Sequence, residues 1–240
     1  MNRFALSLAC AALLAPLSVG CGRDGSSPSG PELPEVVPSQ FVPAITNPYF
    51  PLEPGTTFVY EGRNGDGELE RVEFEVTSET KKILGVTCVV VHDRAFVDGE
   101  LEEDTFDWFA QHENGDIWYF GEDTKEIDNG RVISTEGSWQ AGVDGARAGI
   151  LIQGTPVVGA SYHQEYYKGE AEDMASVVRT DVSVAVRQGA YVNCLQTREW
   201  TPLEPGVAEY KYYAPGVGLI KEEMAQGGTG GLELVEIRTK

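Results

Sequence analysis

The residues best suited to acid–base or metal chemistry in this chain are three histidines and a large excess of carboxylates. The intervals between His92, His112 and His163 match neither an HExxH pair nor a structural zinc site. The sequence from Gly159 to His163 lacks the second glycine of a GxSxG nucleophile elbow, and neither a GxGxxG motif nor a P-loop occurs. The sequence therefore predicts no catalytic residue, no metal site and no cofactor.

The N-terminus has the pattern of an export signal. Met1–Arg3 supplies positive charge, and residues 4–17 form an apolar stretch of signal-peptide length. Leu17-Ser-Val-Gly-Cys21 resembles the lipobox of bacterial lipoproteins, although that family prefers Leu where Ser18 stands. The resemblance implies cleavage before Cys21 and diacylation of Cys21, and by analogy Gly22 favours the outer membrane. The alternative is an ordinary secretory signal followed by a chance cysteine.

Two cysteines remain for the exported domain. Of the four in the chain, Cys10 lies in the signal and Cys21 is the expected lipid site, which leaves Cys88 and Cys194 on predicted strands. An even pair in an oxidising compartment favours a disulfide between them. The alternative is two separate buried thiols.

The charge balance limits the classes of partner. Asp and Glu number 38 against 18 Lys and Arg, which gives a net charge of -20 and a pI near 4.4. Binding to phosphates requires clusters of Lys and Arg, so nucleic acid is not expected as a partner. The expected partners are the membrane, through the N-terminal lipid, and either an apolar ligand or another protein.

Composition divides the chain into three parts. Residues 1–20 are the expected lipoprotein signal peptide, residues 21–45 a tether rich in Pro, Gly and Ser, and residues 46–240 a single β-rich domain. The composition of the tether favours an extended polyproline II conformation and cannot build a core.

In the domain the hydrophobic period is two, which indicates strands. Val72, Phe74 and Val76 alternate with polar residues, and residues 86–91 resemble a strand that is buried on both faces. Turn signals separate such runs at hairpin spacing: Asn64-Gly65, Asp98-Gly99, Asn114-Gly115 and Asn129-Gly130. The pattern predicts an all-β fold with minor helix, an antiparallel meander curled into a barrel or half-barrel.

Two segments do not follow the period of two. Glu170–Val178 is the one candidate for a helix, of one or two turns. Residues 137–159 are rich in glycine and are expected to form a long connection that partly covers the concave face of the sheet.

Two stretches carry a family resemblance. Asn47-Pro-Tyr-Phe-Pro-Leu52 before Pro54–Tyr60 resembles the opening of many uncharacterised bacterial envelope lipoproteins, and the sequence from Gly189 to Leu195 followed by Tyr212–Ile220 resembles their ending. The resemblance covers about residues 46–223. It implies a β-rich extracytoplasmic domain, and it transfers no catalytic residue.

Aromatic residues crowd several predicted strands, and a curled sheet of this size has room for a concave face lined by rings. Trp118, Tyr162 and Tyr166 are the expected ligand-binding residues of such a face. The alternative is that these rings fill the core. The leading hypothesis is therefore a lipid-anchored, non-catalytic binding module, and its rivals are a hydrolase that uses carboxylates and an acidic structural surface protein.

We expect the Cys21→Ser substitution to release the exported domain from membranes, because the variant lacks the thiol that would carry lipid. Phase partitioning in detergent measures this directly. A variant that still enters the detergent phase would show that something other than Cys21 anchors the protein.

Overall fold

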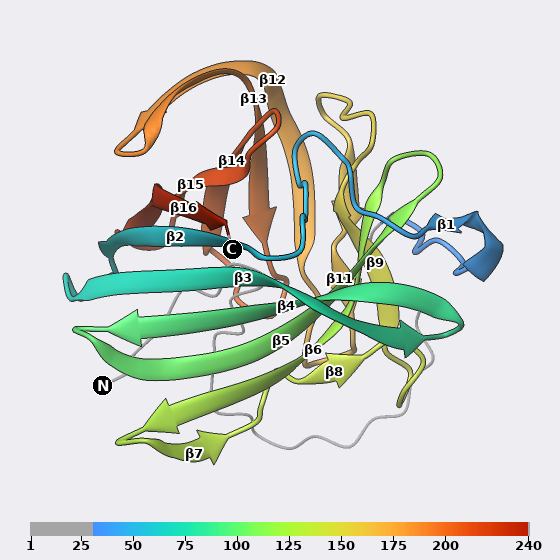
Figure 1. Ribbon diagram of the computed structural model, residues 1–240, viewed down its shortest axis with the longest axis horizontal. Coiled ribbons are helices and arrows are strands. Elements are labelled where there is room, and N and C mark those ends of the chain that lie inside the picture. The colour runs from blue at the N-terminus through green and yellow to red at the C-terminus, as the bar shows by residue number, and fades with distance from the viewer. Residues whose placement is uncertain (1–30, 240) are drawn as a thin grey trace.

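In the computed structural model of the chain, which describes residues 31–239, one antiparallel sheet curls until its two ends meet (Figure 1). The order of strands is β10-β12-β13-β14-β15-β16-β2-β3-β4-β5-β6-β9-β11, and β1, β7 and β8 attach at the sides. The prediction of an all-β meander curled into a near-barrel is therefore confirmed. No helix in the described part of the chain is long and apolar enough to cross a membrane.

The strands follow the alternation and turn signals of the sequence. A short 3-10 helix, η1, spans Pro38–Gln40. The strands are β1 (Phe41–Val42), β2 (Thr56–Arg63), β3 (Leu69–Ile83), β4 (Val86–Val97), β5 (Glu100–His112), β6 (Ile117–Asp128), β7 (Arg131–Ser134), β8 (Trp139–Gln140), β9 (Arg147–Ile152), β10 (Ser161–His163), β11 (Glu165–Tyr166), β12 (Met174–Val186), β13 (Gly189–Trp200), β14 (Ala208–Ala214), β15 (Gly218–Gln226) and β16 (Gly231–Thr239).

The sheet closes at Gln164, which joins its two terminal strands β10 and β11. Gln164 is 1% exposed, and its side-chain amide donates a hydrogen bond to the carbonyl of Leu151 on β9 at 3.3 Å. A Cβ on Gly149 would lie 2.5 Å from the backbone of Gln164, so only glycine permits this close approach.

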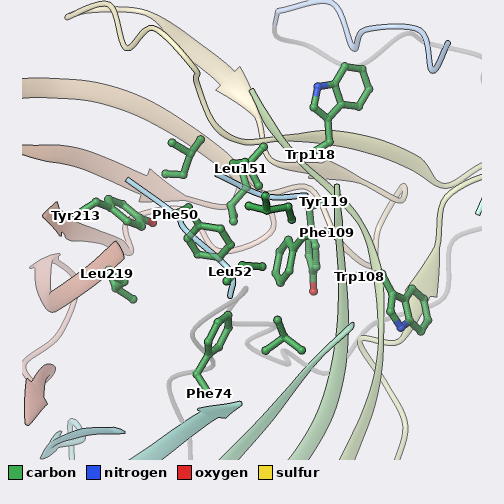
Figure 2. Packing of buried hydrophobic residues seen from close by; sticks show 14 of the residues in the cluster. Phe50, Leu52, Phe74, Trp108, Phe109, Trp118, Tyr119, Leu151, Tyr213 and Leu219 are labelled. Atoms are coloured by element: carbon green, nitrogen blue, oxygen red, sulfur yellow. The ribbon is translucent and has the colours of Figure 1, made fainter. Parts of the chain in front are cut away.

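Each central strand has an inner face and an outer face because successive side chains point to opposite sides of a sheet. One row of directly opposed residues crosses the inner face from Phe58 through Phe74 and Asp93 to Thr105 and Thr124. Figure 2 shows Phe109 and Tyr119 on this side of their strands, with their chain neighbours Trp108 and Trp118 on the other side.

The segment that precedes β2 fills the apolar part of the cup, the space that the inner face encloses. The Asn47 side chain donates to the carbonyl of Gly115 at 2.8 Å, and Gln111 Oε1 accepts a hydrogen bond from the backbone N–H of Asn47 at 2.8 Å. This anchor places Phe50 and Leu52 in the middle of the inner core, where the Phe50 ring lies 5.3 Å from the ring of Phe109 (Figure 2).

Residues 33–45, expected to belong to the tether, pack on the outer face of the sheet. Leu33 is buried, and its carbonyl accepts a hydrogen bond from Arg147 at 2.9 Å. The Phe41 ring lies 5.3 Å from Trp118 and 5.5 Å from Phe120 and covers both. Phe41 therefore covers outward aromatic residues of β6. Cys21 and the rest of the expected tether and signal lie outside the described residues.

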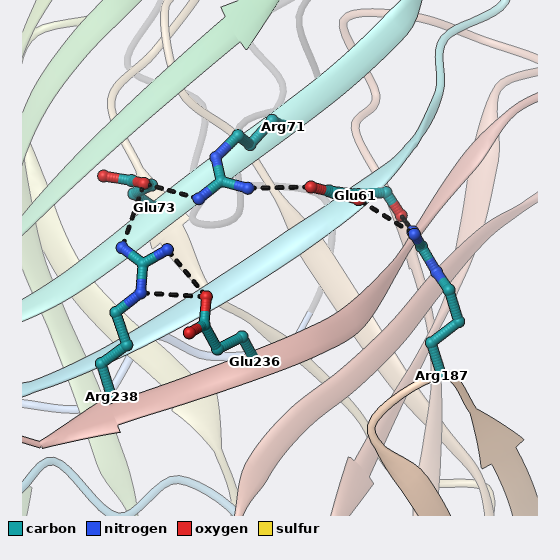
Figure 3. A network of polar contacts seen from close by, with 6 residues as sticks. All are labelled: Glu61, Arg71, Glu73, Arg187, Glu236 and Arg238. Carbon is teal, nitrogen blue, oxygen red and sulfur yellow. Dashed lines mark hydrogen bonds and ion pairs between the residues drawn. The ribbon is translucent and has the colours of Figure 1, made fainter.

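A long hairpin, β12–β13, arches over to the pair β16–β2 (Figure 1). Three register shifts bend it, and Asn193 has a φ of 55° within β13. At its tip Arg187 bonds Glu233 at 2.7 Å and Glu61 at 2.9 Å, and Glu61 also contacts Arg71 (Figure 3). Charge-assisted hydrogen bonds thus hold the tip of the hairpin to β2 and β16.

The structure corrects two expectations about secondary structure. The helix predicted over Glu170–Val178 does not form, since Tyr167–Ala171 is a turn and β12 begins at Met174. Pairing with β13 and the branched side chains of Val177 and Val178 favour a strand there. Within the expected connection 137–159, β9 joins the sheet next to β6, so this segment is partly structural rather than a cover.

The predicted disulfide between Cys88 and Cys194 is not formed, and both are free, buried thiols. Five strands, β14, β15, β16, β2 and β3, separate β13 from β4 in the sheet. A disulfide requires Cα atoms about 4.4–6.8 Å apart. An even number of cysteines carries no information about that distance, which explains the error.

We expect the Cys21→Ser domain, which retains Cys88 and Cys194, to have the same intact mass before and after reduction. An alkylating reagent should label both thiols only after unfolding, because burial raises the pKa of the Cys88 thiol to about 12 and the thiolate is the reactive form. A gain of two hydrogens on reduction, measured by mass spectrometry, would contradict this assignment.

Candidate functional site

The three aromatic residues expected to bind a ligand lie in packed surroundings. Trp118 is buried on the outer face beneath Phe41, and the buried Tyr162 hydroxyl lies 3.5 Å from the carbonyl of Leu151. Tyr166 is half-buried, with its ring 5.9 Å from that of His163. None of the three lines either of the two cavities described below.

The unusual feature of the inner face is a concentration of carboxyl groups. Seven carboxyl side chains of the described residues are buried, and the basic groups buried with them are Lys211 and His163. We call the seven carboxyls and Lys211 the acidic cluster; its carboxyls are Glu70, Asp93, Asp107, Glu122, Glu165, Glu199 and Glu222. Since buried charges are normally paired, this composition demands a physical explanation.

The sheet register places one part of the cluster on β4, β5 and β6. Asp93 is opposite Thr105, Asp107 lies two residues further along β5 on the same face, and Asp107 is opposite Glu122. The Tyr119 hydroxyl donates to Asp107 Oδ1 at 2.7 Å, and the Thr124 hydroxyl donates to Glu122 Oε2 at 2.8 Å. These hydrogen bonds fix two of the three carboxyl groups in orientation.

Trp139 forms the wall beside this part of the cluster. It lies opposite Glu122 in the register, and its ring is 5.4 Å from that of Tyr119. The neighbouring Gly121 has a φ of 125°, and a Cβ there would lie 2.2 Å from the carbonyl oxygen of Trp139. Glycine at this position therefore allows β8 to approach β6 closely enough to bring the indole over the inner face.

The other part of the cluster, on β13, β14 and β15, contains its own cation. Lys211 Nζ lies 3.3 Å from a carboxylate oxygen of Glu199 and 3.5 Å from one of Glu222. Burial lowers the pKa of Lys211, but the charges of Glu199, Glu222 and nearby acidic groups outweigh this effect, so its net pKa lies well above the usual value. Lys211 therefore remains an ammonium ion inside the domain.

Burial and mutual repulsion raise the pKa of several carboxyls in the cluster. The pKa of Asp93 lies well above the usual value. Burial is the largest cause, and the charges of Asp107 and other carboxylates add to it. Burial raises the pKa of Asp107 to about 7 even though the Tyr119 hydrogen bond opposes the shift. Burial also raises the pKa of Glu222 to about 8 despite the attraction of Lys211. In the absence of a bound cation, several of these groups hold protons near neutral pH.

Two cavities flank this arrangement. One of about 20 Å³ lies in the apolar part of the cup among Phe50, Leu52, Phe74 and Phe109. The other, of about 40 Å³, is next to the acidic cluster and is lined by Glu199, Glu209, Lys211 and neighbouring residues. Among the described residues, no group of three or more His, Cys, Asp or Glu side chains is placed to hold a metal ion.

A sequence signal for the acidic cluster exists but is weak. Glu70 has the same strand phase as the core residues Val72 and Phe74, and Asp107 has the same phase as Phe109. An acidic residue separated from core residues by an even number of positions along a strand points to the same face as they do, so its carboxyl is expected to point inward. With 38 acids in the chain, this signal becomes convincing only when several such strands are known to curl around one space.

Comparisons with protein-family models and with curated proteins gave no match. Among solved structures, a "putative exported protein with YmcC-like fold" from Bacteroides fragilis is 17% identical, with a TM-score of 0.49 over 81% of this chain and 100% of that one. A "putative lipoprotein" from Parabacteroides distasonis is 14% identical, with a TM-score of 0.38 over 79% of this chain and 98% of that one. At these values neither neighbour indicates a ligand or an activity for this chain.

We expect the ligand-free domain to lose stability as the pH rises from about 4 to about 8. The folded-state pKa values of Asp107 (about 7) and Glu222 (about 8) lie above the unfolded values near 4, so the folded state binds more protons in this window. For Asp107 the full loss is on the order of 4 kcal/mol, of which roughly 3 kcal/mol falls between pH 5 and pH 8. Urea unfolding at pH 5 and pH 8, after refolding to remove bound molecules, measures it.

The Asp107→Asn substitution should flatten this pH dependence, because asparagine does not titrate. Glu100→Gln, at an exposed position at the start of β5, is the matched control and should leave the slope unchanged. Equal slopes for the native domain and Asp107→Asn would show that Asp107 titrates normally in the folded state.

Proposed function

We propose that this chain is a lipid-anchored protein of the bacterial envelope whose β-domain is a non-catalytic binding module, with the acidic cluster at its binding face. The export signal and Cys21 support the anchoring and the location. The observation that carries the proposal is the set of inward carboxyls on β4, β5 and β6, for which the described residues supply no buried cation comparable to Lys211.

The apolar part of the cup supports an apolar ligand less well. Phe50 and Leu52 from the same chain already occupy it, and the remaining cavity of about 20 Å³ is far smaller than the roughly 300–1,000 Å³ of typical ligand pockets. An apolar ligand would have to displace these side chains. A cationic ligand at the acidic cluster would instead supply the positive charge that the buried carboxyls of β4, β5 and β6 lack among the described residues.

One observation favours a second candidate, a hydrolase that uses carboxylates. A carboxyl group whose pKa is about 7, as for Asp107, is suited to donate a proton near neutral pH. However, Asp107 is held in a hydrogen bond by the Tyr119 hydroxyl, and the sequence contains no motif for a nucleophile that would act with it. Binding therefore accounts for the geometry better than catalysis.

Native mass spectrometry of the Cys21→Ser domain, exported with its own signal and isolated from the periplasm without unfolding, tests the proposed function. We expect a species heavier than the polypeptide that loses the extra mass on denaturation. The double variant Asp107→Asn, Glu122→Gln should carry less of that mass, and Glu100→Gln should carry as much as the native domain. A polypeptide mass alone in every preparation, together with no binding of amines, metal ions or apolar fluorophores, would exclude a binding module.

A further inference from the structure

We propose that Asp93, Asp107 and Glu122 form a binding site for a linear organic amine with two or more protonated nitrogens. This inference rests on the proposed binding function and names the class of ligand at the same face. The site lies on the inner face of β4, β5 and β6, and each of its three carboxyls comes from a different strand.

Asp93 is the centre of the site because its buried carboxyl lacks a partner. The side chain is 3% exposed, and neither oxygen makes a hydrogen bond of ordinary geometry. Only the backbone N–H of Arg94 favours its charged form, while the Arg94 side chain points to the outer face and bonds Glu73 at 3.2 Å. A buried carboxylate without a partner is costly, and a cation in the cup would remove that cost.

The spacing of the three carboxyls fits an extended cation. Asp93 and Asp107 are diagonal neighbours on adjacent strands, about 7–8 Å apart, and Asp107 faces Glu122 directly at about 5 Å. Asp93 and Glu122 are two strand spacings apart and offset by two residues along the strands, which makes about 12 Å. A calcium or magnesium ion requires its oxygen ligands within about 2.0–2.6 Å, and no described group of carboxyls is placed to do this. A linear di- or polyamine spreads its charges over distances of the size that this register implies.

The cluster already contains an example of how an ammonium is held. Lys211 Nζ lies between carboxylate oxygens of Glu199 and Glu222, and the lysine side chain is 4% exposed. The charge of Glu222 also raises the pKa of Asp93, which places the two parts of the cluster in one electrostatic environment. An amine nitrogen between Asp93 and Asp107 would reproduce on β4 and β5 the arrangement that Lys211 makes on β13, β14 and β15.

Aromatic rings next to the carboxyls suit the carbon chain of such an amine. Tyr119 stacks on Phe109 with ring centres 4.9 Å apart, and Trp139 meets Tyr119 edge to face. Aromatic faces attract ammonium groups and pack against methylene groups. The Tyr119 hydroxyl bonds Asp107 Oδ1, whereas Asp107 Oδ2 has no hydrogen-bond partner. Oδ2 therefore remains for the ligand.

Calorimetric titration of the refolded Cys21→Ser domain with spermidine and with putrescine tests the inference. We expect at least one of the two amines to bind with 1:1 stoichiometry, and Asp93→Asn to weaken the binding about tenfold or more, as loss of a charge-assisted hydrogen bond does. Glu122→Gln should also weaken it. Glu100→Gln, matched in chemistry but exposed, should bind as the native domain does.

Other outcomes overturn the inference. Binding of Ca²⁺ or Mg²⁺ without amine binding would assign the cluster to metal ions, and binding of an apolar fluorophore alone would leave the proposed function standing with a different ligand. Failure of both amines to bind a domain whose near-ultraviolet circular dichroism is native also refutes it. Equal amine affinity for the native domain and a folded Asp93→Asn variant would place any amine elsewhere. The titration of the native domain is decisive even if the variants fail to fold.

Discussion

The free-energy cost of removing carboxyl groups from water is the constraint on which the rest of this structure depends. In the described part of the chain, the curled sheet brings seven such groups onto its inner side, where only Lys211 supplies a buried ammonium. A shared space with this composition is stable only when protons or further cations reduce its negative charge. The same constraint separates the interior into an apolar part around Phe50 and Phe109 and an acidic part around Asp93 and Glu222.

A curled sheet with apolar residues on both sides requires two covers, and this chain provides both from residues that precede β2. Phe50 and Leu52 fill the inner side, while Leu33 and Phe41 cover the outer side. One short stretch therefore packs against both faces. This arrangement explains why Ile117–Phe120 of β6 are buried on both faces of the strand.

The sequence predicts the strands and the antiparallel meander because both depend on local signals. Alternation at Val72, Phe74 and Val76 and turns such as Asp98-Gly99 are properties of neighbouring residues. The errors concern relations between distant residues: the pairing of Cys88 with Cys194 and the place of residues 174–178 beside β13. The acidic cluster belongs to the same class, since its members come from strands that only the sheet topology brings around one space.

The pairing of β2 with β16 has a consequence for how the chain folds. These strands lie next to each other in the middle of the sheet order, yet Thr56 is opposite Thr239, near the far end of the described chain. A chain that emerges N-terminus first, from a ribosome or a translocation channel, therefore cannot complete the sheet until Thr239 has emerged. Contacts between such distant residues slow folding because the loop entropy is lost before the contacts form. The topology itself thus delays folding until late in emergence, which keeps the chain in a form that can thread through a narrow channel.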